Sequence, residues 1–213
     1  MIPKIIAISG ISSNCGKTTL LCGLLRKLSN EEAWEAIKLT RGHYRSCGKD
    51  PEACCVSNLL GDEPVIRSGH RQTYAPGKDT GLYWDAGAAN VHWVIATNDQ
   101  VEKGIIQALE RVRSKGVLVE GTSFIKFVKP DFSLLVVRPD NVKMKPSARI
   151  VILNGLIDGI FISGEGPADL LVTNYSSLFD TGASLATFQE YFGKLPIFTR
   201  HDLSRLVELM RSH

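Results

Sequence analysis

Short apolar runs alternate with segments of helical periodicity along the chain. Residues 5–8 are the first apolar run, which is typical of a buried parallel strand. The next segment predicts a helix with one apolar face, formed by Leu20, Leu21, Leu24, Leu25 and Leu28. Further strands are predicted at 36–40, 65–66, 91–96, 116–120, 132–137, 150–153, 159–162, 169–174 and 195–198, and further helices at 51–60, 83–89, 100–114, 184–192 and 202–211. This alternation predicts an α/β fold in three layers, α/β/α, in which helices cover both faces of a mostly parallel sheet.

The turn between the first strand and the first helix has the composition of a phosphate-binding loop. Gly16 lets the backbone approach a ligand closely, and the helix that follows points its free N–H groups and its positive dipole end at that ligand. Lys17 can place its charge on the β- and γ-phosphates, and the Thr18 hydroxyl can bind Mg²⁺. The predicted nucleotide-binding residues of this loop are Gly10, Asn14, Cys15, Gly16, Lys17, Thr18 and Thr19.

The spacing of this loop departs from the commonest pattern. Five residues separate Gly10 from Gly16, where that pattern has four. The Gly-Lys-Thr sequence is nevertheless intact, and it lies between a predicted strand and a predicted helix. We therefore predict a P-loop NTPase fold; the alternative is an ordinary turn between a strand and a helix.

Three charged residues are candidates for the chemistry. Glu120 is the last residue of a predicted buried strand, and Asp79 comes just before a predicted helix. With Thr18, these carboxylates are predicted to hold Mg²⁺. Lys38 interrupts a predicted strand, and there it could meet phosphate or substrate. We predict Lys17, Lys38 and Glu120 as catalytic residues.

An alternative, purely structural role is open for Asp79, Glu120 and Lys38. Asp79 could serve as a helix N-cap, because Asp is favoured there. Glu120 could be the solvent-facing end of its strand. Lys38 could lie on an edge strand, or its side chain could reach solvent.

A long irregular segment, from about residue 41 to residue 80, holds three of the five cysteines. Cys47, Cys54 and Cys55 are candidate ligands of zinc or an iron–sulfur cluster, with His43 and His70 on either side. Their spacing is not that of a zinc finger, and the alternative is that they pack as small hydrophobic residues. We treat the segment as an insertion in a single domain that spans residues 1–213.

Two other features bear on ligands. Asn174 ends a predicted strand, where its amide could recognise a purine edge or cap the next turn. Lys143, Lys145 and Arg149 form a basic stretch, which either faces solvent or meets an anionic substrate or phosphate.

Composition narrows the function classes. The net charge of +3 is too small to favour nucleic-acid or membrane binding, and no apolar run is long enough to cross a bilayer. The apolar content of 44% suits a globular domain. The first strand starts almost at the N-terminus, so no signal peptide is predicted. Because five cysteines accompany a nucleotide loop, we expect a cytoplasmic protein with reduced thiols or a metal site.

The loop with five residues between its glycines resembles that of the dethiobiotin synthetase and cobyrinic acid synthase group of P-loop proteins. The resemblance extends to Ile37-Lys38, to Asp79-Thr80 before an Ala-Gly-Ala turn, and to Val119-Glu120-Gly121. It implies that the lysine contacts phosphate or substrate and that the acidic residues hold Mg²⁺. It also implies a homodimer, since members of this class often work as dimers.

The stretch Gly77-Lys78-Asp79-Thr80, with the Ala-Gly-Ala turn at 86–88, is also similar to the B protein of molybdopterin-guanine dinucleotide biosynthesis. That family binds GTP and assists a partner enzyme. This chain departs from it at Thr40-Arg41-Gly42-His43, where the family has Lys-His, and in the spacing of the loop.

These observations predict Mg²⁺-dependent nucleoside triphosphate binding, with hydrolysis or phosphoryl transfer in cofactor biosynthesis. The acceptor would be a small molecule or a protein partner. The alternative is a nucleotide-switched accessory or metallocentre-assembly protein with slow turnover. The choice between ATP and GTP stays open, because the chain has no Asn-Lys-x-Asp guanine signature.

Overall fold

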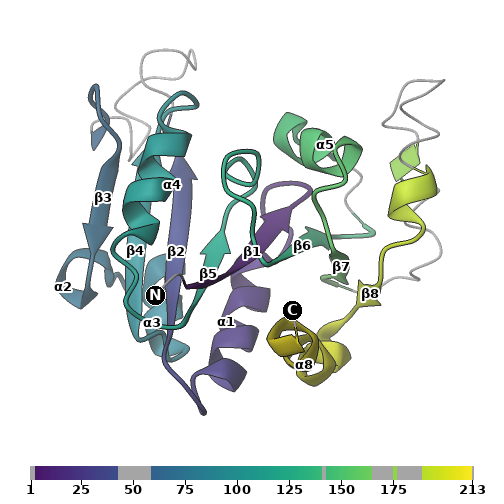
Figure 1. The fold of residues 1–213 in the computed structure, drawn as a ribbon, viewed down its shortest axis with the longest axis horizontal. Coiled ribbons are helices and arrows are strands. Elements are labelled where there is room, and N and C mark those ends of the chain that lie inside the picture. Colours follow the sequence, from purple (N-terminus) through teal and green to yellow (C-terminus); the bar gives the residue numbers. More distant parts are fainter. Residues whose placement is uncertain (1–2, 43–58, 141–142, 165–174, 177–188, 213) are drawn as a thin grey trace.

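The computed structural model describes residues 3–42, 59–140, 143–164, 175–176 and 189–212. Within these residues, strands from both halves of the chain join in one eight-stranded sheet with the order β3-β4-β2-β5-β1-β6-β7-β8 (Figure 1). Of the described strands, only β3 is antiparallel to its neighbour, and the other pairs are parallel. The strands are β1 Lys4–Gly10, β2 Trp34–Arg41, β3 Val65–Ser68, β4 Asn90–Ala96, β5 Gly116–Glu120, β6 Phe132–Val137, β7 Gly159–Ile162 and β8 Ile197–Phe198.

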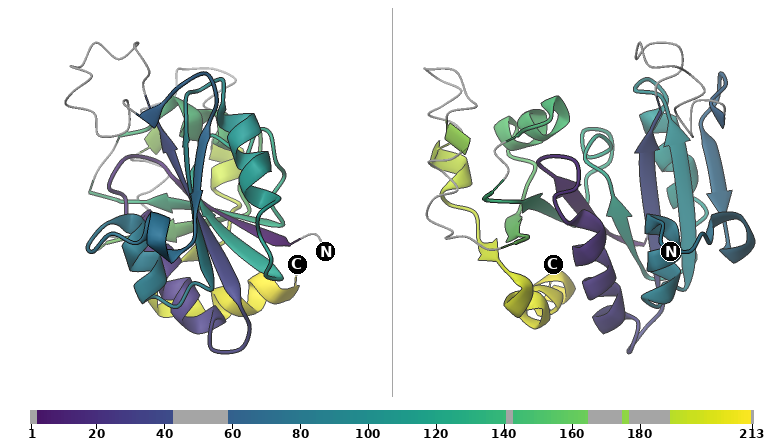
Figure 2. Two further views of the ribbon diagram at one scale, coloured as in Figure 1. Left: turned by 90° about the vertical axis from the view of Figure 1, so that its left-hand side faces the viewer. Right: turned by 180° about the vertical axis from the view of Figure 1, so that it is seen from behind.

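Helices pack on both faces of this sheet, which Figure 2 shows along its edge. One apolar core contains residues of α4 (Val101–Leu109) and α5 (Pro146–Leu153). The other contains residues of α1 (Lys17–Leu28), α3 (Asp79–Asp85) and α8 (Leu203–Ser212). The short α2 (His70–Thr73) and the 3₁₀ helix η3 (Arg200–Asp202) are further helices, and residues 175–176 and 189–192 are also helical. The predicted three-layer α/β fold with a mostly parallel sheet is therefore confirmed.

β1 illustrates why an unbroken apolar run forms a central strand. Ala7 belongs to the core on the α4 and α5 side, whereas Ile6 and Ile8 belong to the core on the α1 side. Alternate side chains of a strand point to opposite faces, so a strand covered on both sides must be apolar at every position. The chain supplies this at residues 5–8 of β1, 117–119 of β5 and 134–137 of β6, the three central strands of the sheet.

The prediction of a strand at 150–153 is wrong, because these residues form the last half of α5. Four consecutive apolar residues fit either structure. Pro146 at the start of the helix fixes a helical φ there, and only one face is buried: Val151 is 2% exposed whereas Ile150 is 46% exposed.

Other predicted boundaries shift by a few residues. The helix predicted at 83–89 begins at Asp79 and ends at Asp85, so Asp79 belongs to its first turn and Lys78 holds the N-cap position. The strand predicted at 36–40 begins at Trp34, and the helix predicted at 100–114 ends at Leu109. The predicted strand at 169–174 and most of the predicted helices at 51–60 and 184–192 lie outside the described residues.

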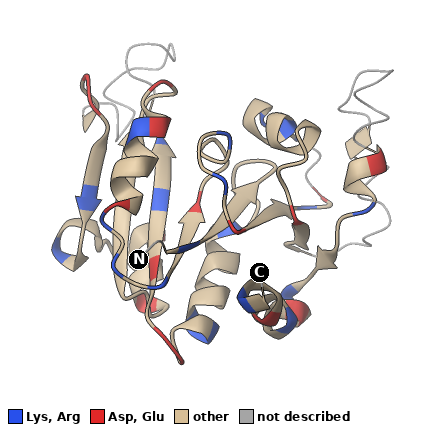
Figure 3. Ribbon diagram, in the orientation of Figure 1, with Lys and Arg blue, Asp and Glu red and all other residues tan. Residues whose placement is uncertain are grey.

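Basic and acidic residues are interspersed along the described elements (Figure 3). No helix in the described part of the chain has the length and apolar character needed to cross a membrane.

Candidate functional site

The loop between β1 and α1 needs glycine at both ends. Gly16 has a φ of 92°, in the left-handed region that favours glycine. A Cβ at this residue would also lie 2.0 Å from the Ser163 Oγ. A Cβ at Gly10 would lie 2.6 Å from the Cys15 Sγ and 2.7 Å from the Lys17 Cδ. The backbone therefore follows a path that larger residues at these two positions would block.

The N-terminus of α1 has the features of an anion-binding site. Helix geometry leaves the first N–H groups without partners inside the helix, and α1 has no side-chain cap because its N-cap residue is Gly16. The helix dipole adds partial positive charge at the same end. Lys17 adds a full charge, with its Nζ 3.3 Å from the Ser12 backbone oxygen and 3.6 Å from the Cys15 Sγ. Donors and charge thus converge on one point, as phosphate binding requires.

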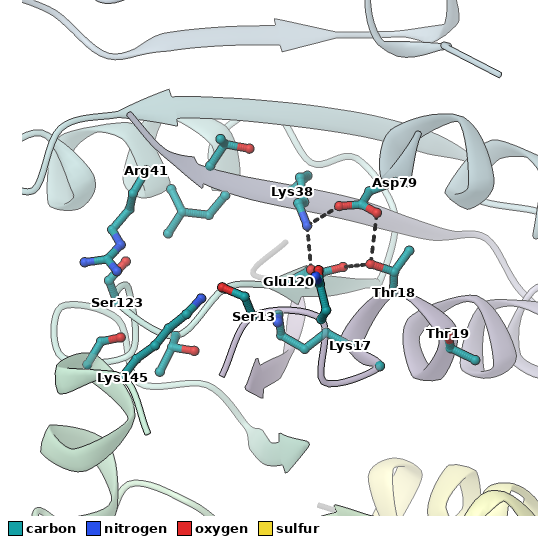
Figure 4. A pocket seen from close by; sticks show the side chains of 17 residues that line it. Ser13, Lys17, Thr18, Thr19, Lys38, Arg41, Asp79, Glu120, Ser123 and Lys145 are labelled. Atoms are coloured by element: carbon teal, nitrogen blue, oxygen red, sulfur yellow. Dashed lines mark hydrogen bonds and ion pairs between the residues drawn. The ribbon is translucent and has the colours of Figure 1, made fainter. Parts of the chain in front are cut away.

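Beside this loop, four side chains from separate elements form one polar cluster (Figure 4). The Thr18 Oγ1 lies 2.9 Å from the Glu120 Oε2 and 3.1 Å from the Asp79 Oδ1. The Lys38 Nζ lies 2.5 Å from both the Asp79 Oδ2 and the Glu120 Oε1. The Tyr83 hydroxyl donates a further hydrogen bond to Glu120. The cluster thus places a hydroxyl and two carboxylates around one positive charge.

Burial and charge act against each other within this cluster. Burial alone would lower the pKa of Lys38, but the adjacent Glu120 and Asp79 outweigh it and hold that pKa above its ordinary value. Burial likewise tends to raise the pKa of Asp79, but the hydrogen bond and charge of Lys38 lower it on balance. The pKa of Tyr83 is raised well above its ordinary value, first by burial and then by the charge of Glu120. Tyr83 is therefore a protonated donor at neutral pH.

The strand order brings this cluster together. β5 lies between β2 and β1, and in the parallel register Glu120 is the partner of Lys38 on β2 and of Ile8 on β1. β2 is an interior strand, so the alternative that Lys38 lies on a sheet edge is wrong. Glu120 is 2% exposed, so the alternative of a solvent-facing strand end is wrong as well. Asp79 enters from α3, where its position in the first turn rules out the alternative of an N-cap.

A cavity of about 640 Å³ opens over the loop and the cluster. The predicted residues that line it are Asn14, Gly16, Lys17, Thr18, Thr19, Lys38, Asp79 and Glu120. Gly10 and Cys15 do not line it, and the Cys15 side chain is fully buried among the core residues on the α1 side. Gly10 and Cys15 instead contribute to the backbone path and to the packing of the loop.

The cavity also has lining residues that the sequence analysis did not assign to the site. Arg41 ends β2, and Thr122 follows β5, where its hydroxyl accepts a hydrogen bond of 3.1 Å from the Gly10 N–H. Lys145 comes from the basic stretch before α5. Burial, and then the nearby charges of Lys17 and Arg41, lower the pKa of Lys145. The sequence marked Lys145 as part of a basic stretch that could meet phosphate. Only the fold shows that Lys145 and Lys17 line the same cavity (Figure 4).

Several predicted ligand residues lie outside the described part of the chain: Cys47, Cys54, Cys55, His43 and Asn174. Within the part that is described, no group of three or more His, Cys, Asp or Glu side chains is arranged to hold a metal ion.

The residues of the cluster fit a magnesium ion. Mg²⁺ prefers oxygen ligands, in proteins commonly one or two carboxylates, with the remaining positions taken by phosphate and water. Thr18, Asp79 and Glu120 provide oxygen atoms that already share hydrogen bonds at one place. Both carboxylates form ion pairs with the Lys38 ammonium, so their negative charge suits a cation.

No protein-family model matches the sequence, and no curated protein matches it. Among solved structures, the fold is similar to HypB from Helicobacter pylori in complex with nickel, with 12% identity and a TM-score of 0.49 over 99% of this chain and 86% of that one. It is also similar to LpxK from Aquifex aeolicus in complex with ATP, with 14% identity and a TM-score of 0.46 over 93% of this chain and 54% of that one.

A plasmid partition protein from Borrelia burgdorferi is similar at 9% identity and a TM-score of 0.44, over 100% of this chain and 99% of that one. The chain therefore spans about half of the LpxK chain but nearly all of the partition protein. Likenesses this distant identify no family.

Proposed function

We propose that this protein binds a nucleoside triphosphate with Mg²⁺ and hydrolyses it or transfers its γ-phosphoryl group. The observation that carries the proposal is the position of Thr18. Its hydroxyl lies at the first turn of a helix whose open N-terminus follows a glycine loop, and it also lies within hydrogen-bonding distance of two carboxylates. A phosphate site and a cation site thus share one residue, as binding of a metal–triphosphate complex requires.

The residues have distinct roles in this proposal. The N–H groups at the start of α1 and the Lys17 ammonium bind the β- and γ-phosphates. Thr18, with Asp79 and Glu120, holds Mg²⁺, which when bound neutralises charge on the phosphates. Tyr83 orients Glu120 through its hydrogen bond.

Lys38 has a role that changes with the ligand. Its ammonium forms ion pairs with Asp79 and Glu120, which offsets one of their two negative charges, and it lines the cavity. When a cation neutralises the same two carboxylates, the Lys38 charge becomes available to the γ-phosphate or to an acceptor. Catalysis would then consist mainly of positioning and charge stabilisation.

The resemblances in sequence support further parts of the proposal. They favour ATP or GTP as the nucleotide, a role in cofactor biosynthesis and a homodimer, while the five cysteines beside a nucleotide loop favour a cytoplasmic location. A nucleotide-switched accessory protein with slow turnover is the second candidate, and the similarity of the segment at 77–80 to a GTP-binding assistant protein supports it. An enzyme should hydrolyse nucleotide faster when its small-molecule acceptor is added, whereas an accessory protein should respond to a protein partner.

The first experiment replaces Lys17 with Ala. We expect the affinity for fluorescent ATP and GTP analogues, measured by anisotropy with Mg²⁺, to fall about 10- to 100-fold or more, since hydrogen bonds to charged groups contribute about 1.5–3 kcal/mol. Lys115→Ala is the matched control, because Lys115 is exposed and precedes β5, at the opposite end of that strand from Glu120. Wild-type affinity in Lys17→Ala would refute the loop assignment.

A further inference from the structure

A smaller cavity of about 240 Å³ adjoins the one over the phosphate-binding loop. The two cavities share four lining residues, Arg41, Thr122, Ser123 and Ser147. Arg41 ends β2, the two hydroxyl residues Thr122 and Ser123 follow β5, and Ser147 lies in the first turn of α5. A molecule in this side cavity would therefore lie directly beside a nucleotide bound at the loop.

The polar wall of the side cavity is positively charged. Arg41 and Lys126 both line it, and none of the described residues that line it is acidic. The Arg41 Nη1 donates a hydrogen bond of 3.1 Å to the Asn98 Oδ1, which holds the guanidinium at the rim. An arginine has five N–H donors in a planar fork, so this single bond leaves donors for a carboxylate or phosphate group. Charge and donors at this wall thus suit an anionic head group.

The α5 residues that line the side cavity are apolar apart from Ser147. Pro146, Ile150 and Val151 of α5 line it. Val151 is buried in the core, whereas Ile150 is 46% exposed, one of the few large apolar side chains on the surface of the described chain. A ligand that covers Ile150 would remove apolar area from water, so this wall suits a hydrocarbon portion.

We propose that the side cavity binds the second ligand of this protein, and that this ligand is an organic anion with a short apolar chain. A volume of 240 Å³ corresponds to roughly eight non-hydrogen atoms, if each takes the ~30 Å³ of a water molecule in the liquid. The proposal deepens the proposed function, because it names the chemical class of the molecule that lies beside the nucleotide. Its head group, carboxylate or phosphate, faces Arg41 and Lys126, and its chain faces Ile150.

The test uses hexanoate and hexyl phosphate as probes, with hexylamine as the probe of opposite charge and butyrate as the shorter chain. Binding is measured by calorimetry on the full chain, with and without Mg²⁺ and a non-hydrolysable ATP or GTP analogue. We expect at least one of the six-carbon anions to bind, and hexylamine not to bind. If hexanoate binds, it should bind about tenfold tighter than butyrate or more, because it has two more CH₂ groups and each contributes about 0.8 kcal/mol when buried. The tighter of the two six-carbon anions identifies the head group.

Variants separate this site from the nucleotide site. Lys126 lines only the side cavity, so Lys126→Glu should weaken binding of the anionic probe about threefold or more while nucleotide affinity stays unchanged. Lys129→Glu, an exposed lysine nearby, is the matched control and should change neither. Lys17→Ala should weaken nucleotide binding but leave binding of the probe unchanged, so failure of the proposed function would not be mistaken for failure of this one.

Three outcomes would overturn the inference. The first is that neither six-carbon anion binds at millimolar concentration. The second is that hexylamine binds as tightly as the anions. The third is that Lys126→Glu and Lys129→Glu weaken the probe equally, which would indicate diffuse surface charge rather than a site.

Discussion

Tyr83 is the fully buried member of the charged cluster, and its hydroxyl donates to Glu120. Among the described residues, Glu120 has three partners: the Tyr83 hydroxyl, the Thr18 hydroxyl and the Lys38 ammonium. A buried carboxylate that loses a donor keeps its desolvation cost without the compensating hydrogen bond. Tyr83 therefore contributes both to the stability of the fold and to the orientation of a proposed metal ligand.

We predict that Tyr83→Phe lowers the free energy of unfolding by about 1–3 kcal/mol. It should also weaken Mg²⁺-dependent nucleotide binding about 10-fold or more, as loss of an outer hydrogen bond to a metal ligand typically does. Denaturant titration and a Mg²⁺ titration of nucleotide binding measure the two effects. The control is Tyr74→Phe, at a tyrosine that is 39% exposed, and an equal effect of the two substitutions would contradict this role.

Glu35 is a second buried carboxylate, and its hydrogen-bond partners are not residues of the charged cluster. It accepts hydrogen bonds of 2.7 and 2.8 Å from the backbone N–H groups of Arg113 and Ser114, and its Oε2 lies 2.7 Å from the His92 Nε2. The Ser68 Oγ lies 2.8 Å from the other nitrogen of the His92 ring. Burial tends to raise the pKa of Glu35, but these hydrogen bonds outweigh it and lower that pKa below its ordinary value of 4.5.

A lowered folded-state pKa means that ionised Glu35 stabilises the fold above about pH 4.5 and that this contribution is lost as the pH falls through the folded-state pKa. We predict that Glu35→Gln lowers the free energy of unfolding at pH 7 by about 1–3 kcal/mol and flattens its decline below pH 4.5. Urea titrations between pH 3 and pH 7 test this. Glu63→Gln, in an exposed ion pair with Lys103, should have an effect below about 1 kcal/mol and the wild-type pH profile.

At the scale of elements, α3 is the part of the site whose position depends most on close backbone packing. Its first residue is Asp79, and it also carries Tyr83. A Cβ at Gly81 would lie 2.0 Å from the Ala75 backbone oxygen, so α3 packs against the preceding turn with no room for a side chain. The close packing of Gly81 thus positions the Asp79 carboxylate and the Tyr83 hydroxyl. Gly81 itself contacts neither of these two groups.

We predict that Gly81→Ala lowers the free energy of unfolding by about 1–3 kcal/mol, because the added methyl group must displace backbone. It should also weaken Mg²⁺-dependent nucleotide binding, since Asp79 and Tyr83 move with the helix. Gly61→Ala is the control, because nothing lies within 4 Å of a Cβ at that residue. Thermal unfolding with and without nucleotide compares the two variants, and equal behaviour would refute the packing argument.

Local sequence pattern was sufficient for some of these elements. The apolar runs predicted β1, β5 and β6, and the Gly-Lys-Thr sequence between a strand and a helix placed the loop. Pattern failed for α5, because its Ile150-Val151-Ile152-Leu153 run suits a buried strand equally well. Pro146 and packing on one face make this segment a helix, and neither of them belongs to the four-residue run itself.

The same limit applies to the residues of the site. Thr18, Lys38, Asp79 and Glu120 were candidates because each stands at a distinctive place in a local pattern. Tyr83 was not, because a tyrosine in a predicted helix gives no sign of the carboxylate that it will meet. That contact depends on where α3 packs relative to β5, which periodicity within either segment does not encode.

At the scale of the whole molecule, the cluster joins residues that are far apart in the chain. Thr18 and Glu120 are separated by 102 positions and Thr18 and Asp79 by 61. A ligand that binds this cluster therefore binds only the folded state, and folding and binding are linked.

We predict that a nucleotide with Mg²⁺ raises the melting temperature in proportion to the logarithm of its concentration. At a concentration 100-fold above Kd the stabilisation should be about 2.7 kcal/mol. Differential scanning calorimetry at several concentrations measures the shift, and Lys17→Ala should show a smaller shift at each concentration because its Kd is higher. A shift of wild-type size in that variant would mean that the nucleotide stabilises the protein from another site.

The strand order has a consequence for synthesis on the ribosome. β1 and β2 are made first, yet they are not neighbours, because β5 inserts between them. Until residue 120 has left the exit tunnel, the facing edges of β1 and β2 have no partner strand in the nascent chain, and such edges invite pairing with other chains. A pause in translation shortly before β5 would therefore prolong the exposure of both edges. Emergence of Gly116–Glu120 lets β5 pair with both strands and adds Glu120, the last carboxylate of the cluster, in the same step.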